Sequence, residues 1–118
     1  MVNIYHPRGI RKPSAIITVA AAATPEVLYQ LTMAGQVQRT VILRKIHAYN
    51  NVGATTLMIG TGLGAGWAQQ WSTFRLVNAM DNFWTEDQIV EVELAADLTV
   101  QTDVLGVLVQ VEVEEVSS

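Results

Sequence analysis

Residues 107–114 read VLVQVEVE, a stretch in which every second side chain is valine. Because successive side chains of a β-strand point to opposite faces, this period of two predicts a half-buried strand. The valines form its core face, and Gln110, Glu112 and Glu114 lie on a face that meets solvent or an interface. No long segment of the chain shows the period of 3.6 that is typical of an amphipathic helix.

Two segments further upstream alternate in the same way. Residues 27–33 and 89–94 are each expected to bury one face, and in the second segment that face carries Val90, Val92 and Leu94. Less regular strands are expected at 15–20, 39–49, 55–59, 73–79 and 98–102. About eight short strands at roughly ten-residue spacing are typical of an antiparallel sandwich or barrel.

The segment from Val41 to Ile46 departs from simple alternation. Its apolar residues fall on both faces, which indicates either a β-bulge or a strand that is buried on both sides.

The composition allows one domain with an uncharged surface. A chain of 118 residues can bury one sizeable core. Only 15% of its residues are charged, against roughly 25% in ordinary soluble domains. An uncharged surface fits a subunit interface, although polar uncharged faces also occur on monomers.

The charges are segregated along the chain. Residues 1–80 hold all seven Lys and Arg with Glu26 as the one acid, whereas residues 81–118 hold the other ten acids. Opposite charges can pair on neighbouring strands of a sheet, or they can face each other across a subunit contact. Pairing within the chain is the simpler expectation.

The first fourteen residues, MVNIYHPRGIRKPS, have no periodicity and predict an extended basic N-terminal arm, with the sandwich in residues 15–118. Such arms fray unless a surface holds them, and that surface is either the arm's own domain or a neighbouring subunit. Together with the apolar run 15–23, the arm has the outline of a signal peptide, but Pro7 and Pro13 fit poorly there, so no cleavage is expected. The apolar run is too short to span a membrane.

Residues 60–71, GTGLGAGWAQQW, contain a G-x-G-x-x-A spacing, and Asp81 follows about twenty residues later. This is the outline of a dinucleotide-binding fingerprint. However, the space left for a crossover helix is too short, and strands alone follow Asp81. The glycines are better explained by a loop in which two backbones approach closely.

Residues for catalysis are scarce. The chain has no cysteine, and its two histidines are His6 in the arm and His47 in a strand, so a triad would depend on His47. Outward glutamates on alternating strands are ordinary solvation, and no metal or cofactor is expected. A pI near 4.9 argues against nucleic-acid binding, apart from a local contact by the arm.

The aromatic residues cluster in and after the loop. Trp67, Trp71 and Trp84 are expected mainly in the core, with one available as an interface anchor. The residues predicted to bind a partner are Tyr5, His6, Arg8, Ile10, Arg11 and Lys12 in the arm, and Trp67 and Trp71 in the loop.

The order of elements, with a basic arm, VILRKIHAYNNVGATTLMIGTG at the centre and a valine-rich last strand, resembles small bacteriophage jelly-roll structural proteins of the capsid decoration (cement) type. This resemblance implies an all-β, single antiparallel β-sandwich of jelly-roll type. It also implies a non-enzymatic virion protein, assembled in the host cytoplasm, whose homotrimers bind a capsid or other virion protein. The alternative that remains open is a β-sandwich module that binds a glycan or small ligand at the Gly- and Trp-rich loop.

Overall fold

The computed structural model describes residues 10–32, 39–51 and 53–117. Tyr5, His6 and Arg8, three of the predicted contact residues, lie outside these described residues, as does Met33 at the end of the expected strand 27–33. No helix in the described part of the chain is long and apolar enough to cross a membrane.

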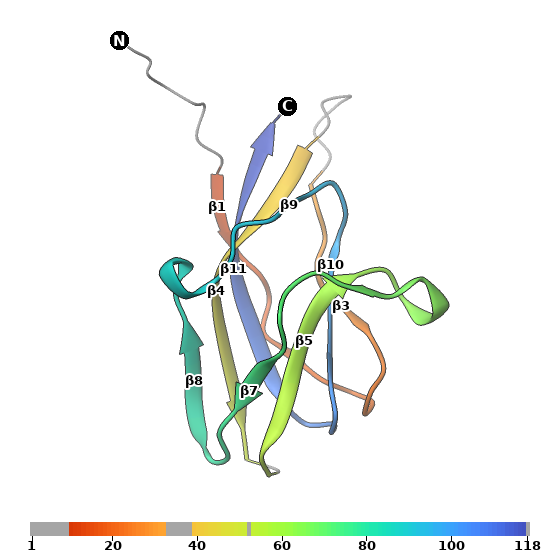
Figure 1. The fold of residues 1–118 in the computed structure, drawn as a ribbon, viewed down its shortest axis with the longest axis vertical. Helices are drawn as coiled ribbons and strands as arrows, with labels where there is room; N and C mark the ends of the chain where they lie inside the picture. Colours follow the sequence, from red (N-terminus) through yellow and green to blue (C-terminus); the bar gives the residue numbers. More distant parts are fainter. Residues whose placement is uncertain (1–9, 33–38, 52, 118) are drawn as a thin grey trace.

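The described residues form eleven strands and two single-turn 3-10 helices (Figure 1). The strands are β1 (Ile10–Pro13), β2 (Ile17–Thr18), β3 (Glu26–Tyr29), β4 (Arg39–Asn50), β5 (Thr55–Thr61), β6 (Ala68–Gln69), β7 (Phe74–Leu76), β8 (Met80–Trp84), β9 (Glu93–Leu94), β10 (Leu98–Thr102) and β11 (Leu108–Ser117). The 3-10 helices are η1 (Gly64–Gly66) and η2 (Glu86–Gln88).

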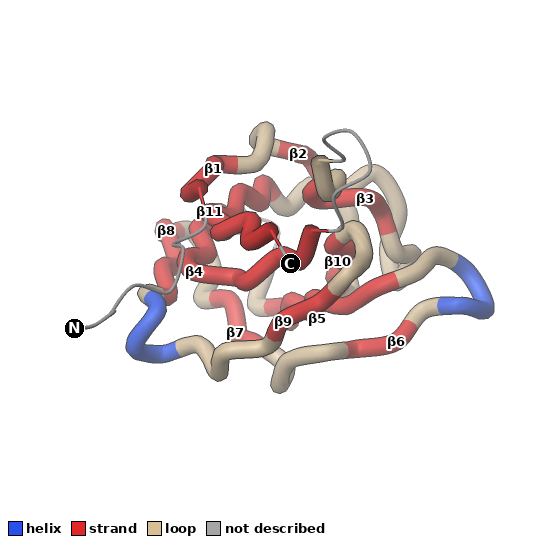
Figure 2. The backbone as a smooth tube through the Cα atoms, turned by 90° about the horizontal axis from the view of Figure 1, so that it is seen from above, coloured by secondary structure: helices blue, strands red, loops and turns tan. Residues whose placement is uncertain are grey.

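The strands build two antiparallel sheets that pack face to face as a sandwich (Figure 2). The six-stranded sheet has the order β1-β11-β4-β8, with β2 also paired to β11 and β9 also paired to β4. The five-stranded sheet has the order β3-β10-β5-β6, with β7 also paired to β5. The chain repeatedly crosses from one sheet to the other, which gives the jelly-roll-like, all-β fold predicted from the sequence.

The core lies between the sheets, and the valine face of β11 is part of it. Val107, Val109, Val111 and Val113 are all buried, as the alternation of this segment predicts. Trp71 also lies in the core at 5% exposure, and its indole Nε1 donates a hydrogen bond to the carbonyl oxygen of Val90.

Each of the eight segments expected to form strands contains one, and three strands were not expected. These are β1, β6 and β8. Strand β1 lies inside the segment predicted as an arm and pairs with β11 from Ile10↔Glu115 to Pro13↔Glu112. Within the described residues, strand pairing in the sandwich therefore already includes Ile10–Pro13.

The predicted alternation in residues 89–94 is confirmed at Val92 and Leu94, which pack against the core, and is wrong at Val90. Ile89 is buried and Val90 is 74% exposed. The cause is η2 just before this segment, where Thr85 and Gln88 form a capping box that turns the chain. Ile89 then enters the core, and only Glu93–Leu94 pair as a strand.

Regular alternation in residues 27–33 is also wrong. Leu28 and Tyr29 are neighbours in the sequence, yet both are buried. The register between β3 and β10 shifts between Leu98 and Thr99, so the two sides of this pair fall out of step.

The irregularity expected in residues 41–46 is confirmed in both of its forms. Glu112 pairs with Lys45 and Val113 pairs with Leu43, so Arg44 is an extra residue in β4 and forms a bulge. Next to the bulge, Val41, Ile42 and Leu43 are buried in succession.

Candidate interaction surface

A groove runs along the outer face of the six-stranded sheet, with β11 as its floor. Its larger part has a volume of about 480 Å³, and a smaller part of about 190 Å³ continues from it. Both parts are lined by His47 and Gln110, so they adjoin each other at these two side chains. Pro13 and Ile16, on either side of the β1–β2 connection, line it on one side, and β4 and β8 line it on the other.

The centre of the groove is set by strand register. His47 on β4 is the cross-strand partner of Gln110 on β11 and of Phe83 on β8, so the three side chains share one row. The rings of His47 and Phe83 stack with centroids 4.3 Å apart and planes 9° from parallel. Phe83 stays 62% exposed despite this stack, although phenylalanine is one of the residue types most often found buried.

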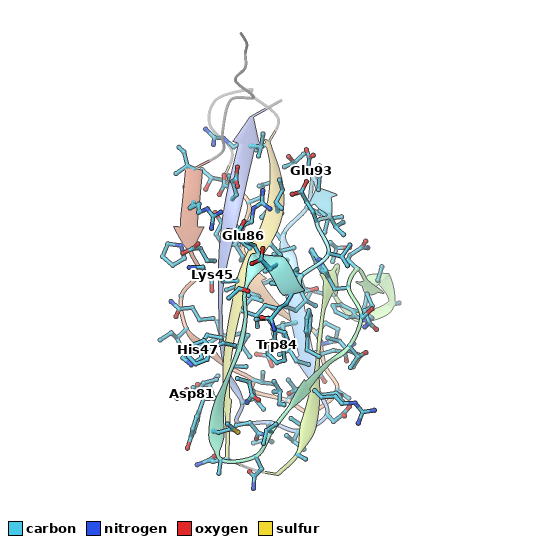
Figure 3. All side chains as sticks on the ribbon, turned by 60° about the vertical axis from the view of Figure 1, so that its left-hand side comes forward. Lys45, His47, Asp81, Trp84, Glu86 and Glu93 are labelled. Atoms are coloured by element: carbon cyan, nitrogen blue, oxygen red, sulfur yellow. The ribbon has the colours of Figure 1, made fainter. Side chains whose placement is uncertain are left out.

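Asp81 fixes the imidazole of this stack. Its Oδ1 lies 2.8 Å from Nε2 of His47. Figure 3 shows His47 and Asp81 projecting from the same side of the sheet, whereas Trp84 lies toward the sandwich interior, where it packs against the core. The imidazole of His47 is therefore held in place by the hydrogen bond to Asp81 at its edge and by the stack on Phe83 at its face.

An ion-pair network borders the groove near η2. Arg11 on β1 contacts Glu86 at 3.0 Å and Glu112 at 3.1 Å. The hydrogen bond from Arg11 lowers the pKa of the Glu86 carboxyl. The two carboxylates in turn raise the pKa of Arg11 through hydrogen bonds.

Arg44, the bulge residue, forms the second part of this network. Its Nε lies 3.0 Å from Glu114, and its NH1 lies 2.9 Å from Glu91 and 3.8 Å from Glu86. Burial opposes the charge of Arg44, but hydrogen bonds to Glu91 and Glu114 outweigh that penalty and raise its pKa. One guanidinium thus joins β4, β11 and the segment around η2.

The most buried charge in the described residues is the carboxylate of Glu115, at one end of β11. It accepts hydrogen bonds from the Tyr29 hydroxyl and from the Thr32 backbone N–H, and Lys12 and Arg39 each lie 3.7 Å away. Burial alone would raise the pKa of Glu115, but these donors and the charge of Lys12 lower it. Burial raises the pKa of the Tyr29 hydroxyl, and its hydrogen bond to Glu115 raises it further.

These contacts confirm that the segregated charges pair within the chain. Every ion pair among the described residues joins a base from the first eighty residues to an acid from the last thirty-eight. The sequence halves are brought together because β1 and β4 both flank β11.

The structure does not bring the five predicted contact residues that it describes into one place. Ile10 is exposed on β1, and Arg11 and Lys12 make the ion pairs described above. Trp67 is half-buried beside β6, and Trp71 belongs to the core. Figure 2 shows β1 and β6 on opposite sides of the sandwich.

The Gly-rich segment is the end of a hairpin between β5 and β6. A Cβ atom on Gly60 would lie 2.1 Å from the carbonyl oxygen of Ala68, and one on Gly62 would lie 2.2 Å from that of Gly66. This confirms the expectation of a close backbone approach. The antiparallel pairing of β5 with β6 has no room for the βαβ unit of a dinucleotide site.

The stacked row of the groove was not found by sequence reasoning. From the sequence, His47 was placed in a strand and considered only as a member of a triad, and Phe83 was given no role. Their contact depends on the register between β4 and β8, for which the sequence gives no signal. Within the described residues, no three His, Asp or Glu side chains gather as metal ligands.

Comparisons with known proteins give the fold class. No protein-family model matches the sequence, and a search of curated proteins finds no match. Among solved structures, a chain of the Bacillus endospore appendages, described as a novel family of disulfide-linked pili, matches with a TM-score of 0.50 and 12% identity, over 99% of this chain and 96% of that one. The extra small virus of the prawn Macrobrachium rosenbergii gives a TM-score of 0.35 at 13% identity, over 98% and 82%, which does not establish a shared fold.

This chain is therefore a jelly-roll-like β-sandwich similar in fold to a pilin subunit. The likeness concerns architecture alone at this level of identity.

Proposed function

We propose that this chain is a non-enzymatic structural subunit that assembles with copies of itself, as a capsid decoration protein of a virion. The observation that carries the proposal is how the surface is composed. Arg11, Lys12, Arg39 and Arg44 are engaged in ion pairs within the chain. Residues 48–74 contain no charged side chain at all.

Large apolar side chains are exposed on this weakly charged surface. Ile16, Leu63, Phe83, Val90 and Leu105 each expose more than half of their area. Exposing such side chains to water is unfavourable, and burying them against another molecule is favourable. Association with another copy is a direct way to cover them.

The fold likeness supports assembly in general. The similar Bacillus protein forms pili, and the jelly-roll resemblance seen in the sequence implies homotrimers on a capsid. The present chain has no cysteine, so its contacts cannot be disulfide-linked as those of the Bacillus pili are. Its assembly must rest on packing and hydrogen bonds.

The test is the solution mass of the intact chain and of a truncated chain, by light scattering after size exclusion. The truncation removes residues 1–9 only, because Ile10–Pro13 pair with β11 and Lys12 contacts buried Glu115. We expect a discrete oligomer, a trimer or larger, for the intact chain and dissociation after truncation. If the intact chain is monomeric at all concentrations, the proposal is overturned. If the intact and the truncated chain both form oligomers, the chain assembles without residues 1–9.

The alternative of a ligand site in the Gly60–Trp71 loop has lost part of its support. A stacking platform needs an exposed ring, and Trp71 is buried in the core. Trp67, half-buried at the hairpin, is the loop tryptophan on which that alternative now depends.

A further inference from the structure

We propose that the groove along β11 is a binding site for a short, uncharged oligosaccharide. This function goes beyond assembly and uses a face that the loop hypothesis does not include. Its core is the row of Gln110, His47 and Phe83 across β11, β4 and β8.

The shape of the groove fits a short oligosaccharide. The larger part of the groove, about 480 Å³, falls within the ~300–1,000 Å³ of ordinary ligand sites. Its lining on β11 runs from Leu108 to Glu112, which corresponds to about 14 Å of extended strand. An open, elongated depression of this kind fits a chain of linked rings better than a compact ligand.

The aromatic rings of Phe83 and His47 offer a surface on which a sugar ring can pack. The face of a pyranose ring that carries C–H bonds packs favourably on an aromatic ring, which offers an apolar and electron-rich surface. Phe83 is exposed and stacked on His47, and Asp81 holds the imidazole by a hydrogen bond. Little conformational freedom is therefore lost when a ligand covers these rings.

Polar side chains in the groove can hydrogen-bond to a sugar. Asp81, Gln110 and Lys45 line the groove and can accept or donate the hydrogen bonds that sugar hydroxyls need. A fatty-acyl chain would leave these groups unpaired, at a cost in free energy. The groove therefore places a few hydrogen-bonding groups along a mainly apolar wall, and a sugar can meet both with its hydroxyl edges and its C–H faces.

The balance of charges in the groove favours an uncharged ligand. Glu112 is paired with Arg11 and lies opposite Lys45 in register, and Asp81 is hydrogen-bonded to His47. The charges of the groove are thus balanced locally. An anionic ligand such as a nucleic acid needs a surplus of positive charge, and this groove does not offer one.

The experiment titrates the full chain with uncharged oligosaccharides of glucose, mannose, galactose and N-acetylglucosamine. Binding is followed by calorimetry. We expect at least one sugar to bind, and we expect Phe83→Ala to weaken it by about tenfold or more. Because Phe83 is exposed, this variant is expected to fold, which circular dichroism checks.

The matched control is Leu63→Ala, which removes an exposed apolar side chain on the far hairpin and should leave binding unchanged. Absence of binding across the panel at millimolar concentration would overturn the proposal. So would binding that Trp67→Ala abolishes and Phe83→Ala does not, because that result places the site in the loop. Sugar binding by a chain that stays monomeric would separate this proposal from that of assembly.

Discussion

The hydroxyl of Tyr29 on β3 donates a hydrogen bond to the carboxylate of Glu115 on β11, and this buried pair ties the two sheets of the sandwich together. Glu115 is 1% exposed. A carboxylate so deeply buried is tolerated only where donors and opposite charges compensate its lost hydration. Lys12 from β1 and Arg39 from β4 supply those charges, so four strands meet at one side chain.

Replacing Tyr29 by Phe removes one donor from this cluster and leaves the carboxylate short of a partner. We expect the free energy of unfolding to fall by ~1–3 kcal/mol, measured by urea denaturation at pH 7. Tyr49→Phe is the matched control, because no hydrogen bond of the Tyr49 hydroxyl occurs among the described residues. Equal effects of the two substitutions would show that the buried pair contributes nothing specific.

The same cluster predicts a pH dependence. The folded pKa of Glu115 lies below its ordinary value of 4.5, so the ionised side chain stabilises the fold above that pH. This contribution is lost as the pH falls through the folded pKa. The stability of the wild-type chain relative to Glu115→Gln should therefore be constant near neutrality and decrease below pH 4.5, in urea titrations between pH 3 and 7.

The comparison cancels the other carboxylates, which titrate in both proteins. If the wild type instead gained stability relative to Glu115→Gln on acidification, the folded pKa of Glu115 would be raised and the described cluster would be wrong.

The parts of the fold that were predicted depend on local pattern. The valine alternation gave β11, and the apolar residues on both faces of 41–46 gave the bulge. Strand β8 was missed because Asn82 occupies a buried position where alternation calls for an apolar side chain. Its amide is satisfied instead by backbone carbonyls, including those of Val77 and Met80, which only the folded turn provides.

The site was harder to predict because it depends on contacts between distant strands. His47 and Phe83 are thirty-six residues apart, and their stacking follows from the register of β4 with β8. A one-residue slip would place Phe83 on the other face of the sheet. The charge segregation, by contrast, predicted pairing within the chain without any knowledge of strand register, since opposite charges can pair wherever their strands become neighbours.

Gly60 and Gly66 allow a test of the β5–β6 hairpin. Gly60→Ala places a methyl group against the backbone of Ala68, so we expect ~1–3 kcal/mol of destabilisation and faster hydrogen exchange at the Gln70 N–H, which is bonded to the carbonyl of Ile59. Gly66→Ala meets open space and should leave stability unchanged or slightly raised. Destabilisation by the second substitution alone would contradict this geometry.

Arg44 should stabilise the sandwich much more than Arg75 does. Arg44→Met removes a mostly buried guanidinium from Glu114, Glu91 and Glu86, and the expected loss is ~1–3 kcal/mol in urea denaturation at low salt. Arg75 is exposed and has no ion pair among the described residues, so Arg75→Met should change stability by less than ~0.5 kcal/mol. Because Glu91 is largely exposed, added salt should reduce the difference in the free energy of unfolding between Arg44→Met and Arg75→Met without abolishing it. If the two variants were equally stable at low salt, the charge of Arg44 would not contribute to stability, and the extra residue of the bulge would matter only for the backbone.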